Sequence, residues 1–136
     1  MTKSKYGNKK VTVDGHVFDS GIEARYYEQV KWLKNTGEIK SFTLQPRYLL
    51  QESFRKGKTL HRKIEYVADF EIIHIDGTIE VVDIKGFETT DFNIKKKLFE
   101  YKYPHKLSLL TYSKIDGGWI ELADLKKNRK LRKKNK

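Results

Sequence analysis

The chain has 136 residues, of which 38% are hydrophobic and none is cysteine, and a formal net charge of +11 at pH 7. This length suits one domain with a modest core, and the absence of cysteine excludes disulfide bonds and thiolate zinc sites. The first ten residues lack an apolar run and no later segment reaches a membrane-spanning length. We therefore expect a soluble protein with no membrane partner that stays in the cytoplasm.

The positive charge is concentrated at the two ends of the sequence. Residues 1–10 hold four lysines and no acid, residues 126–136 hold eight Lys or Arg and no acid, and the segment between them holds 17 basic and 18 acidic residues. The chain is therefore divided into a basic N-terminal arm (1–10), a near-neutral domain (11–125) and a basic C-terminal tail (126–136). Such extensions bind polyanions, with nucleic acid as the leading candidate and an acidic protein partner or a solubilising tail as alternatives.

A hairpin and a helix are the first predicted elements. Residues 11–13 and 16–18 flank Asp14-Gly15, which is typical of a tight hairpin turn. Ser20 is the expected N-cap of a helix that ends before Gly37. Its apolar stripe is formed by Ile22, Tyr26, Val30 and Leu33.

The middle of the chain predicts several strands. Residues 38–51 are interrupted by Gln45-Pro46, which fits an edge strand or two short strands, and residues 55–58 form a polar turn. Residues 63–73 and 78–85 are rich in β-branched and aromatic side chains and predict a hairpin. If its turn is type I with Gly77 left-handed, paired residue numbers add up to 152; a two-residue turn would make this 153 and move side chains to opposite faces.

A second helix is expected from about residue 91 to 101, with Ile94, Leu98 and Tyr101 facing inward. Residues 107–112 form a buried strand, so strand, helix and strand make a parallel right-handed crossover. Residues 119–122 form a last short strand. The predicted fold class is α/β, a mixed central β-sheet with helices on both faces.

Asp69, Asp83 and Lys85 are the first candidate site residues. With pairs adding up to 152, Asp69 lies opposite Asp83 with Cβ atoms about 5 Å apart, and strand alternation puts Lys85 on the same face. The alternative is that these acids are strand-end residues paired with nearby lysines. Their apolar neighbours favour a site, because buried carboxylates are costly unless a hard cation binds them.

Glu23 is the third acid of interest. Ser20-Gly21-Ile22-Glu23 also fits a capping box, in which glutamate at the third helical position accepts the N-cap amide. The spacing alone does not separate a helix cap from a metal ligand.

The order of a helix with Glu23, a strand with Asp69 and then Asp83-Ile84-Lys85 resembles the PD-(D/E)XK nuclease superfamily. More narrowly, the motifs in residues 18–23, 45–46, 66–70, 82–86 and 95–99 resemble a phage-encoded family of uncharacterised, endonuclease-like domains. More loosely, they resemble the nuclease subunit of TnsA-type transposases. The superfamily's usual proline before the first Asp is Ala68 here, and its central acid is Asp83 instead of glutamate.

The resemblance implies a restriction-endonuclease-like core and Mg²⁺ or Mn²⁺ as cofactor. Asp69, Asp83 and the Ile84 carbonyl would bind the ion, and Glu23 would contact it directly or through water. Lys85 would orient the attacking water or neutralise charge on the phosphate. The catalytic residues are thus expected to be Glu23, Asp69, Asp83 and Lys85.

We expect a divalent-metal-dependent DNA endonuclease acting in replication, recombination or packaging, in the bacterial host cytoplasm if phage-encoded. Its partner is duplex or branched DNA, and a homodimer is left open. The alternatives are a non-catalytic nucleic-acid-binding module on a nuclease scaffold and an adaptor for an acidic protein. Residues expected to bind nucleic acid are Lys95, Lys96, Lys97, Lys126, Lys127, Arg129, Lys130, Arg132, Lys133 and Lys134.

Overall fold

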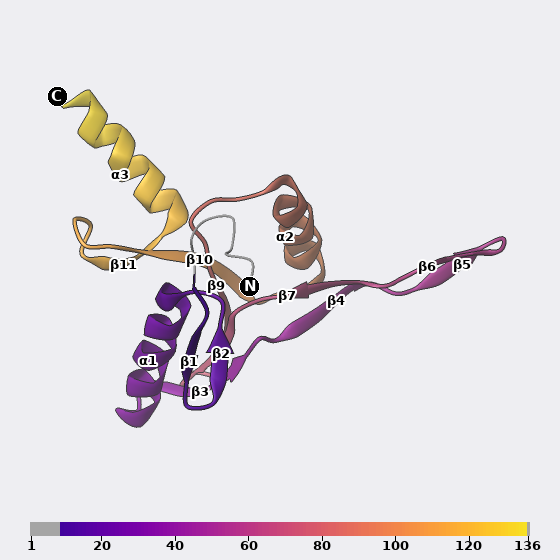
Figure 1. The fold of residues 1–136 in the computed structure, drawn as a ribbon, viewed down its shortest axis with the longest axis horizontal. Helices are drawn as coiled ribbons and strands as arrows, with labels where there is room; N and C mark the ends of the chain where they lie inside the picture. The colour runs from indigo at the N-terminus through magenta and orange to yellow at the C-terminus, as the bar shows by residue number, and fades with distance from the viewer. Residues whose placement is uncertain (1–8, 136) are drawn as a thin grey trace.

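The computed structural model describes residues 9–135, and its centre is a mixed five-stranded β-sheet (Figure 1). Its strand order is β11-β10-β9-β8-β3, with only the β9–β10 pair parallel among these neighbours. The five strands are β3 (Ile39–Leu44), β8 (Phe70–His74), β9 (Ile79–Ile84), β10 (Lys106–Ser113) and β11 (Gly118–Glu121). Of the predicted N-terminal arm, residues 1–8 lie outside the described residues.

Helices pack against both faces of this sheet, as the sequence predicts. Helix α1 (Gly21–Asn35) packs in one hydrophobic cluster with Phe70, Ile72 and Val82. Helix α2 (Thr90–Lys102) contributes Phe92 and Phe99 to a second cluster that contains Val81. Helix α3 (Leu122–Lys134) joins the second cluster through Leu122. The fold is therefore α/β, with a mixed sheet between two apolar layers.

Local turn chemistry accounts for the N-terminal hairpin and α1. Strands β1 (Val11–Val13) and β2 (His16–Phe18) pair antiparallel around Asp14 and Gly15, whose φ angles are 53° and 80°. Two consecutive positive φ angles are the mark of the type I′ turn that Asp-Gly favours. The Ser20 side chain accepts a hydrogen bond at the start of α1, and Gly37 follows the helix with φ 79°. Both predicted helix limits are thus confirmed.

The apolar stripe predicted for α1 is only partly right. Tyr26 and Val30 are buried and Leu33 packs against the core, but Ile22 is exposed. Its place in the core is taken by Ala24 and Tyr27.

The β8–β9 hairpin has the register that the type I turn predicts. Its pairs run from Phe70↔Val82 to Ile73↔Ile79, so that partner numbers add up to 152. The Gly77 amide donates to the His74 carbonyl at 2.9 Å, and Gly77 has φ 88°. The left-handed glycine therefore fixes which side chains share a face of this hairpin.

The predicted strand 63–73 is wrong in one respect: it is divided in two. Its first part, β7 (Ile64–Val67), pairs with β4 (Arg47–Gln51) in a separate sheet, and its second part is β8. The division lies opposite Gln45-Pro46, where Ala68 N donates to Pro46 O and Gln45 N donates to Asp69 O. Gln45 has φ 49°, so the chain turns there and both strands leave the central sheet together.

Beyond β4 and β7, the predicted polar turn is the tip of a long hairpin. Strands β5 (Phe54–Lys56) and β6 (Thr59–His61) pair antiparallel around Gly57-Lys58. This hairpin projects from the body of the molecule (Figure 1).

The predicted inward face of α2 is wrong. Ile94 and Tyr101 are 54% and 93% exposed, and Leu98 is also exposed. Phe92 and Phe99 are buried instead, seven residues apart on another stripe of the helix. Phe99 stacks on Tyr48 at a centroid distance of 4.9 Å, so the larger aromatic rings fill the space beside the second sheet.

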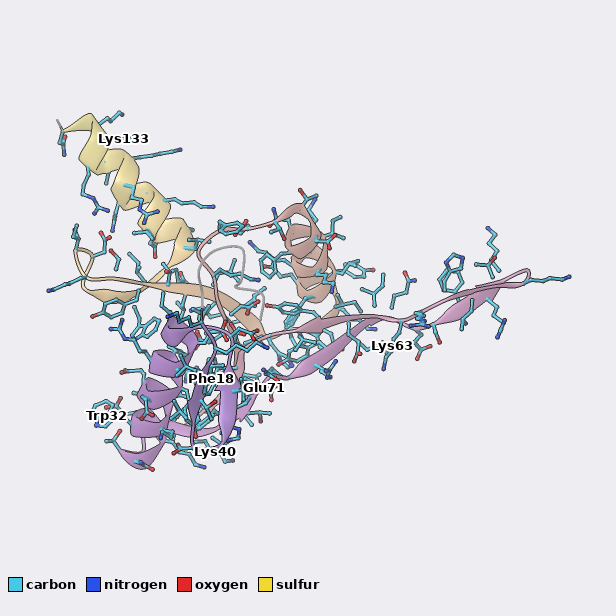
Figure 2. All side chains as sticks on the ribbon, in the orientation of Figure 1. Phe18, Trp32, Lys40, Lys63, Glu71 and Lys133 are labelled. Atoms are coloured by element: carbon cyan, nitrogen blue, oxygen red, sulfur yellow. The ribbon has the colours of Figure 1, made fainter. Side chains whose placement is uncertain are left out.

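The predicted tail continues α3, which already begins at Leu122. Leu122 and Leu125 are buried, and Arg132 donates to Asp116 at 2.7 Å, so the helix is attached along one side. Lys133 lies near its far end, on the opposite side of the molecule from Lys63 of the projecting hairpin (Figure 2).

The β8–β9 turn yields a stability prediction. Gly77→Ala forces a side chain into a left-handed conformation, so we expect it to lower the free energy of unfolding by roughly 1–2 kcal/mol. Gly86→Ala is the control, because Gly86 has ordinary φ and open space at the Cβ position. Chemical denaturation measures both; equal stability of the two variants would show that the turn does not depend on Gly77.

Candidate active site

A cleft of about 400 Å³ lies where β7, β9 and the beginnings of α1 and α2 meet. Glu23, Asp69, Asp83 and Lys85 all line it, although they come from three separate segments of the chain: the start of α1, the residue before β8 and the end of β9. The structure therefore brings together every residue that the sequence predicts to be catalytic. Tyr66, Thr89, Asp91 and Phe92 line the same cleft and were not predicted.

The hairpin register brings Asp69 and Asp83 into contact. Asp69 directly precedes β8 and Asp83 is the fifth residue of β9, so the observed pairing places them opposite each other. Their carboxyl groups hydrogen-bond to each other. The alternative turn, which would have put them on opposite faces, is excluded.

Asp83 is held firmly in the cleft wall. Its side chain is almost fully buried, and Oδ2 accepts a hydrogen bond of 2.6 Å from the Tyr66 hydroxyl. Burial and the nearby Asp83 carboxylate raise the pKa of Tyr66, so the phenol stays protonated and acts as the donor. Tyr66 thus fixes the orientation of Asp83, a role that its position in the sequence does not signal.

Asp69 is bound by the neighbouring strand. Its Oδ2 accepts a hydrogen bond of 2.8 Å from the Ile84 amide at the end of the ladder. Burial, followed by the Asp83 charge, raises the pKa of Asp69 to about 9. The two acids therefore share a proton at neutral pH, because two adjacent carboxylates repel each other.

Lys85 lies beside this acid pair. Its Nζ is 3.7 Å from Asp83 Oδ2 and 4.3 Å from the centre of the Phe92 ring. Strand alternation places Lys85 on the face of Asp83, as predicted, and α2 supplies the aromatic ring beneath its ammonium group. The positive charge is thus held at the cleft with limited freedom.

Glu23 has a contact with the helix start and also faces the cleft. Its amide donates to Ser20 Oγ at 3.2 Å, which is one half of a capping box. Its carboxylate accepts the backbone amide of Asp19 instead of that of Ser20. Burial, with the charges of Asp19 and Asp83, raises the pKa of Glu23, so the Glu23 carboxylate interacts electrostatically with Asp83. It also lines a small adjoining cavity of about 100 Å³ with Gln45 and Asp69.

The predicted nucleic-acid-binding lysines of α2 separate into three environments. Lys95 lines the cleft, whereas Lys96 pairs with Glu88 at 3.8 Å and Lys97 is exposed outside it. The remaining predicted residues are on α3. One of them, Arg132, pairs with Asp116 of the β10–β11 turn and lowers the pKa of that aspartate to about 2. None of the α3 residues lines the cleft.

The acids of the cleft fit an ion such as Mg²⁺, which keeps part of its water shell, better than an ion that takes all of its ligands from the protein. Among residues 9–135, no group of three or more acidic or histidine side chains is close enough to hold an ion alone. Mg²⁺ usually takes one or two carboxylates and completes its shell with water and phosphate oxygens. The Asp69–Asp83 pair meets that requirement, and Glu23 would then be an outer partner.

Comparison with known proteins identifies a family of the whole domain. The family model described as "Protein of unknown function (DUF1064)" matches residues 3–128. No curated protein matches the chain. Within the described part of the chain, each helix is too short or too polar to cross a membrane.

The raised pKa of Asp69 yields a pH-dependent prediction. Because Asp69 is protonated in the folded state and ionised when unfolded, its contribution to stability is complete below about pH 4 and is lost as pH rises toward about 9. Asp69→Asn removes this loss. We expect its melting temperature, without metal, to exceed that of the wild type by about 4 °C or more at pH 8 and to match it near pH 4. A constant difference across this pH range would contradict the shared proton.

Proposed function

The chain belongs to the family described as "Protein of unknown function (DUF1064)", and for this member we propose a divalent-metal-dependent endonuclease that hydrolyses phosphodiester bonds of DNA. One observation carries the proposal. A buried carboxyl group, that of Asp83, contacts the half-buried carboxyl group of Asp69 at the wall of an open cleft, with a lysine ammonium 3.7 Å from Asp83. Two acids and one lysine can hold a cation and a phosphate side by side.

A divalent cation explains why the acid pair exists. Holding two carboxyl groups together away from bulk water costs stability, and a proton compensates for only one of their charges. Mg²⁺ or Mn²⁺ would be held by Asp69, Asp83 and the Ile84 carbonyl, with Glu23 as an outer-sphere partner. When bound, the ion supplies Lewis acidity, which polarises the scissile phosphate and acidifies a nearby water.

The chain's own residues supply the remaining requirements. Tyr66 orients Asp83 by its hydrogen bond, so the ligand is positioned before substrate binds. Lys85 presents a positive charge where negative charge develops on the phosphate, or holds the attacking water. Lys95, also in the cleft, is suited to a neighbouring phosphate.

The resemblance to PD-(D/E)XK nucleases supports the same roles. Its ordered motif of Glu23, Asp69 and Asp83-Ile84-Lys85 corresponds to residues that line one cleft here. The unusual Ala68 is buried and donates to Pro46 O, so this position still supports the turn before Asp69.

Cleavage by substituted proteins tests the proposal. Asp83→Asn and Lys85→Met should each lower cleavage of linear or branched DNA with Mg²⁺ at least about 100-fold, because each removes a charge from the reacting centre. Lys102→Met is the control, because it changes an exposed lysine at the end of α2 that does not line the cleft.

EDTA should also abolish cleavage, and Mn²⁺ should restore it. If the wild type cleaves no DNA with either ion but still binds it, the protein is a non-catalytic nucleic-acid-binding module. Near-normal cleavage by either cleft variant would remove that residue from the catalytic set.

Glu23→Gln separates a cap from a catalytic role. Glutamine keeps an acceptor for the Asp19 amide but loses the charge, so we expect an unchanged melting temperature and at least a tenfold loss of cleavage. Ser20→Ala is the matched control: it should destabilise the protein by about 1 kcal/mol and leave turnover intact. Normal turnover by Glu23→Gln would leave this residue with a capping role only.

A further inference from the structure

The projecting hairpin, residues 47–67, is named the β-arm. Its base is the β4–β7 pair and its tip is the β5–β6 pair. After a bulge between Leu49 and Gln51, partner numbers add up to 115 from Gln51↔Ile64 to Lys56↔Thr59. The two small sheets are therefore one continuous ribbon, which extends away from the body (Figure 1).

The tip of the β-arm has no core of its own. All residues from Gln51 to Lys63 are exposed, including Phe54 and Leu60 at 45% and 51%. Gly57, with φ 63°, makes the tight turn, and Phe54 stacks on His61 at a centroid distance of 4.8 Å. An isolated two-stranded ribbon gains little stability from its own contacts, and the exposed tip adds none to the core of the body. The stability of the fold therefore does not explain why the ribbon is this long.

The tip is strongly basic. Residues 52–63 contain five Lys or Arg and one acid, Glu52. Four of these basic residues form no ion pair with any described residue, whereas Lys63 lies 3.4 Å from Glu65. The four are Arg55, Lys56, Lys58 and Arg62.

These charges are distributed around the ribbon. Arg55 and Lys56 point to opposite faces because neighbouring strand residues alternate, and Lys58 lies in the turn. A partner that meets positive charge on both faces and at the tip must surround the ribbon. The major groove of duplex DNA, about 12 Å wide and walled by phosphates, accepts a two-stranded ribbon, whereas the minor groove is too narrow.

The base of the β-arm ends at the candidate active site. Tyr66 donates to Asp83, and Val67 lines the cleft. From Val67 to Gly57 the extended chain of the arm covers ten residue-to-residue steps, or roughly 33 Å at the usual rise. This is close to one helical turn of duplex DNA, about 34 Å.

We propose that the β-arm lies in the major groove of duplex DNA about one helical turn from the scissile phosphate, and so makes a duplex flank part of the substrate. Its position relative to the cut rests on the proposed nuclease function, but groove binding does not. A second copy of the chain is disfavoured as the occupant, because two arms of the same charge repel and only two large apolar side chains, Phe54 and Leu60, are exposed at the tip.

Binding measured in EDTA tests the proposal without requiring cleavage. The arm variant combines R55Q, K56Q, K58Q and R62Q. The control variant removes four exposed lysines outside the arm and cleft, with K34Q, K40Q, K102Q and K114Q. Lys40 lies at the lower end of the molecule in Figure 2, well away from the arm. Fluorescence anisotropy with a 30-base-pair duplex at several salt concentrations gives affinity and salt slope.

We expect the arm variant to bind at least about tenfold more weakly at physiological salt, with a salt slope shallower by about 0.9 for each phosphate that the arm no longer neutralises. The control should keep a slope within about one unit of the wild type. Wild-type affinity should also rise as the duplex is extended by about ten base pairs beyond the cleft, and the arm variant should lack this gain. Both melting temperatures should stay unchanged, because the substituted side chains are exposed.

Two results would overturn the proposal. One is an arm variant whose affinity and salt slope match those of the control. The other is a wild-type dimer in sedimentation that F54S with L60S converts to a monomer, which would identify the arm as a protein contact. A change of slope in a protein that cleaves no DNA would retain the groove contact and reject the nuclease function instead.

Discussion

The contact between the Asp69 and Asp83 carboxyl groups is the constraint on which the rest of the site depends. Two adjacent acids, one buried and one half-buried, repel unless a proton or a cation lies between them, and the fold nevertheless holds them together. The β8–β9 register makes this unavoidable, because the left-handed Gly77 sets the pairing and the pairing sets the face. Holding two repelling acids together costs stability, and proteins keep such destabilising arrangements where function requires them.

The two hydrophobic layers position the other cleft residues from opposite sides. The cluster under α1 holds the helix whose first turn presents Glu23. The cluster under α2 holds Phe92, on which the Lys85 ammonium lies, and Tyr66, which orients Asp83. The break at Ala68-Asp69 is equally important, since Asp69 there joins the ladder through its backbone, with its amide donating to Val82 O, while its side chain accepts the Ile84 amide. Cleft chemistry thus depends on packing on both faces of one sheet.

The charge of the molecule is unevenly distributed, with a near-neutral body and basic projections. Arg132 of α3 is bound to Asp116, so part of the helix charge is used to attach the helix to the β10–β11 turn. The β-arm differs, because four of its basic side chains have no acidic partner among the described residues. Uncompensated charge on a ribbon that begins at the cleft suits a long polyanion better than a small substrate.

The sequence by itself determined the features that depend on neighbours in the chain. The turns at Asp14-Gly15 and Gly77, the caps of α1 and the parallel β9–α2–β10 crossover follow from local sterics and short connections. The sequence predicted a shared face for Asp69, Asp83 and Lys85 only if the turn at Gly77 was type I, and the observed register decided between the two turns. Tertiary structure decided which stripe of α2 is buried. Ile94 and Phe92 lie on equally plausible helix faces, and only the ring contacts of Phe99 with Tyr48 and of Phe92 with Tyr66 favour the phenylalanine stripe. Tertiary structure also decided that strand 63–73 breaks, since the break pairs with Gln45-Pro46, the connection between β3 and β4. Tyr66 and Phe92 could not be predicted as site residues for the same reason: their partners are distant in sequence, and only the packed sheet brings them together.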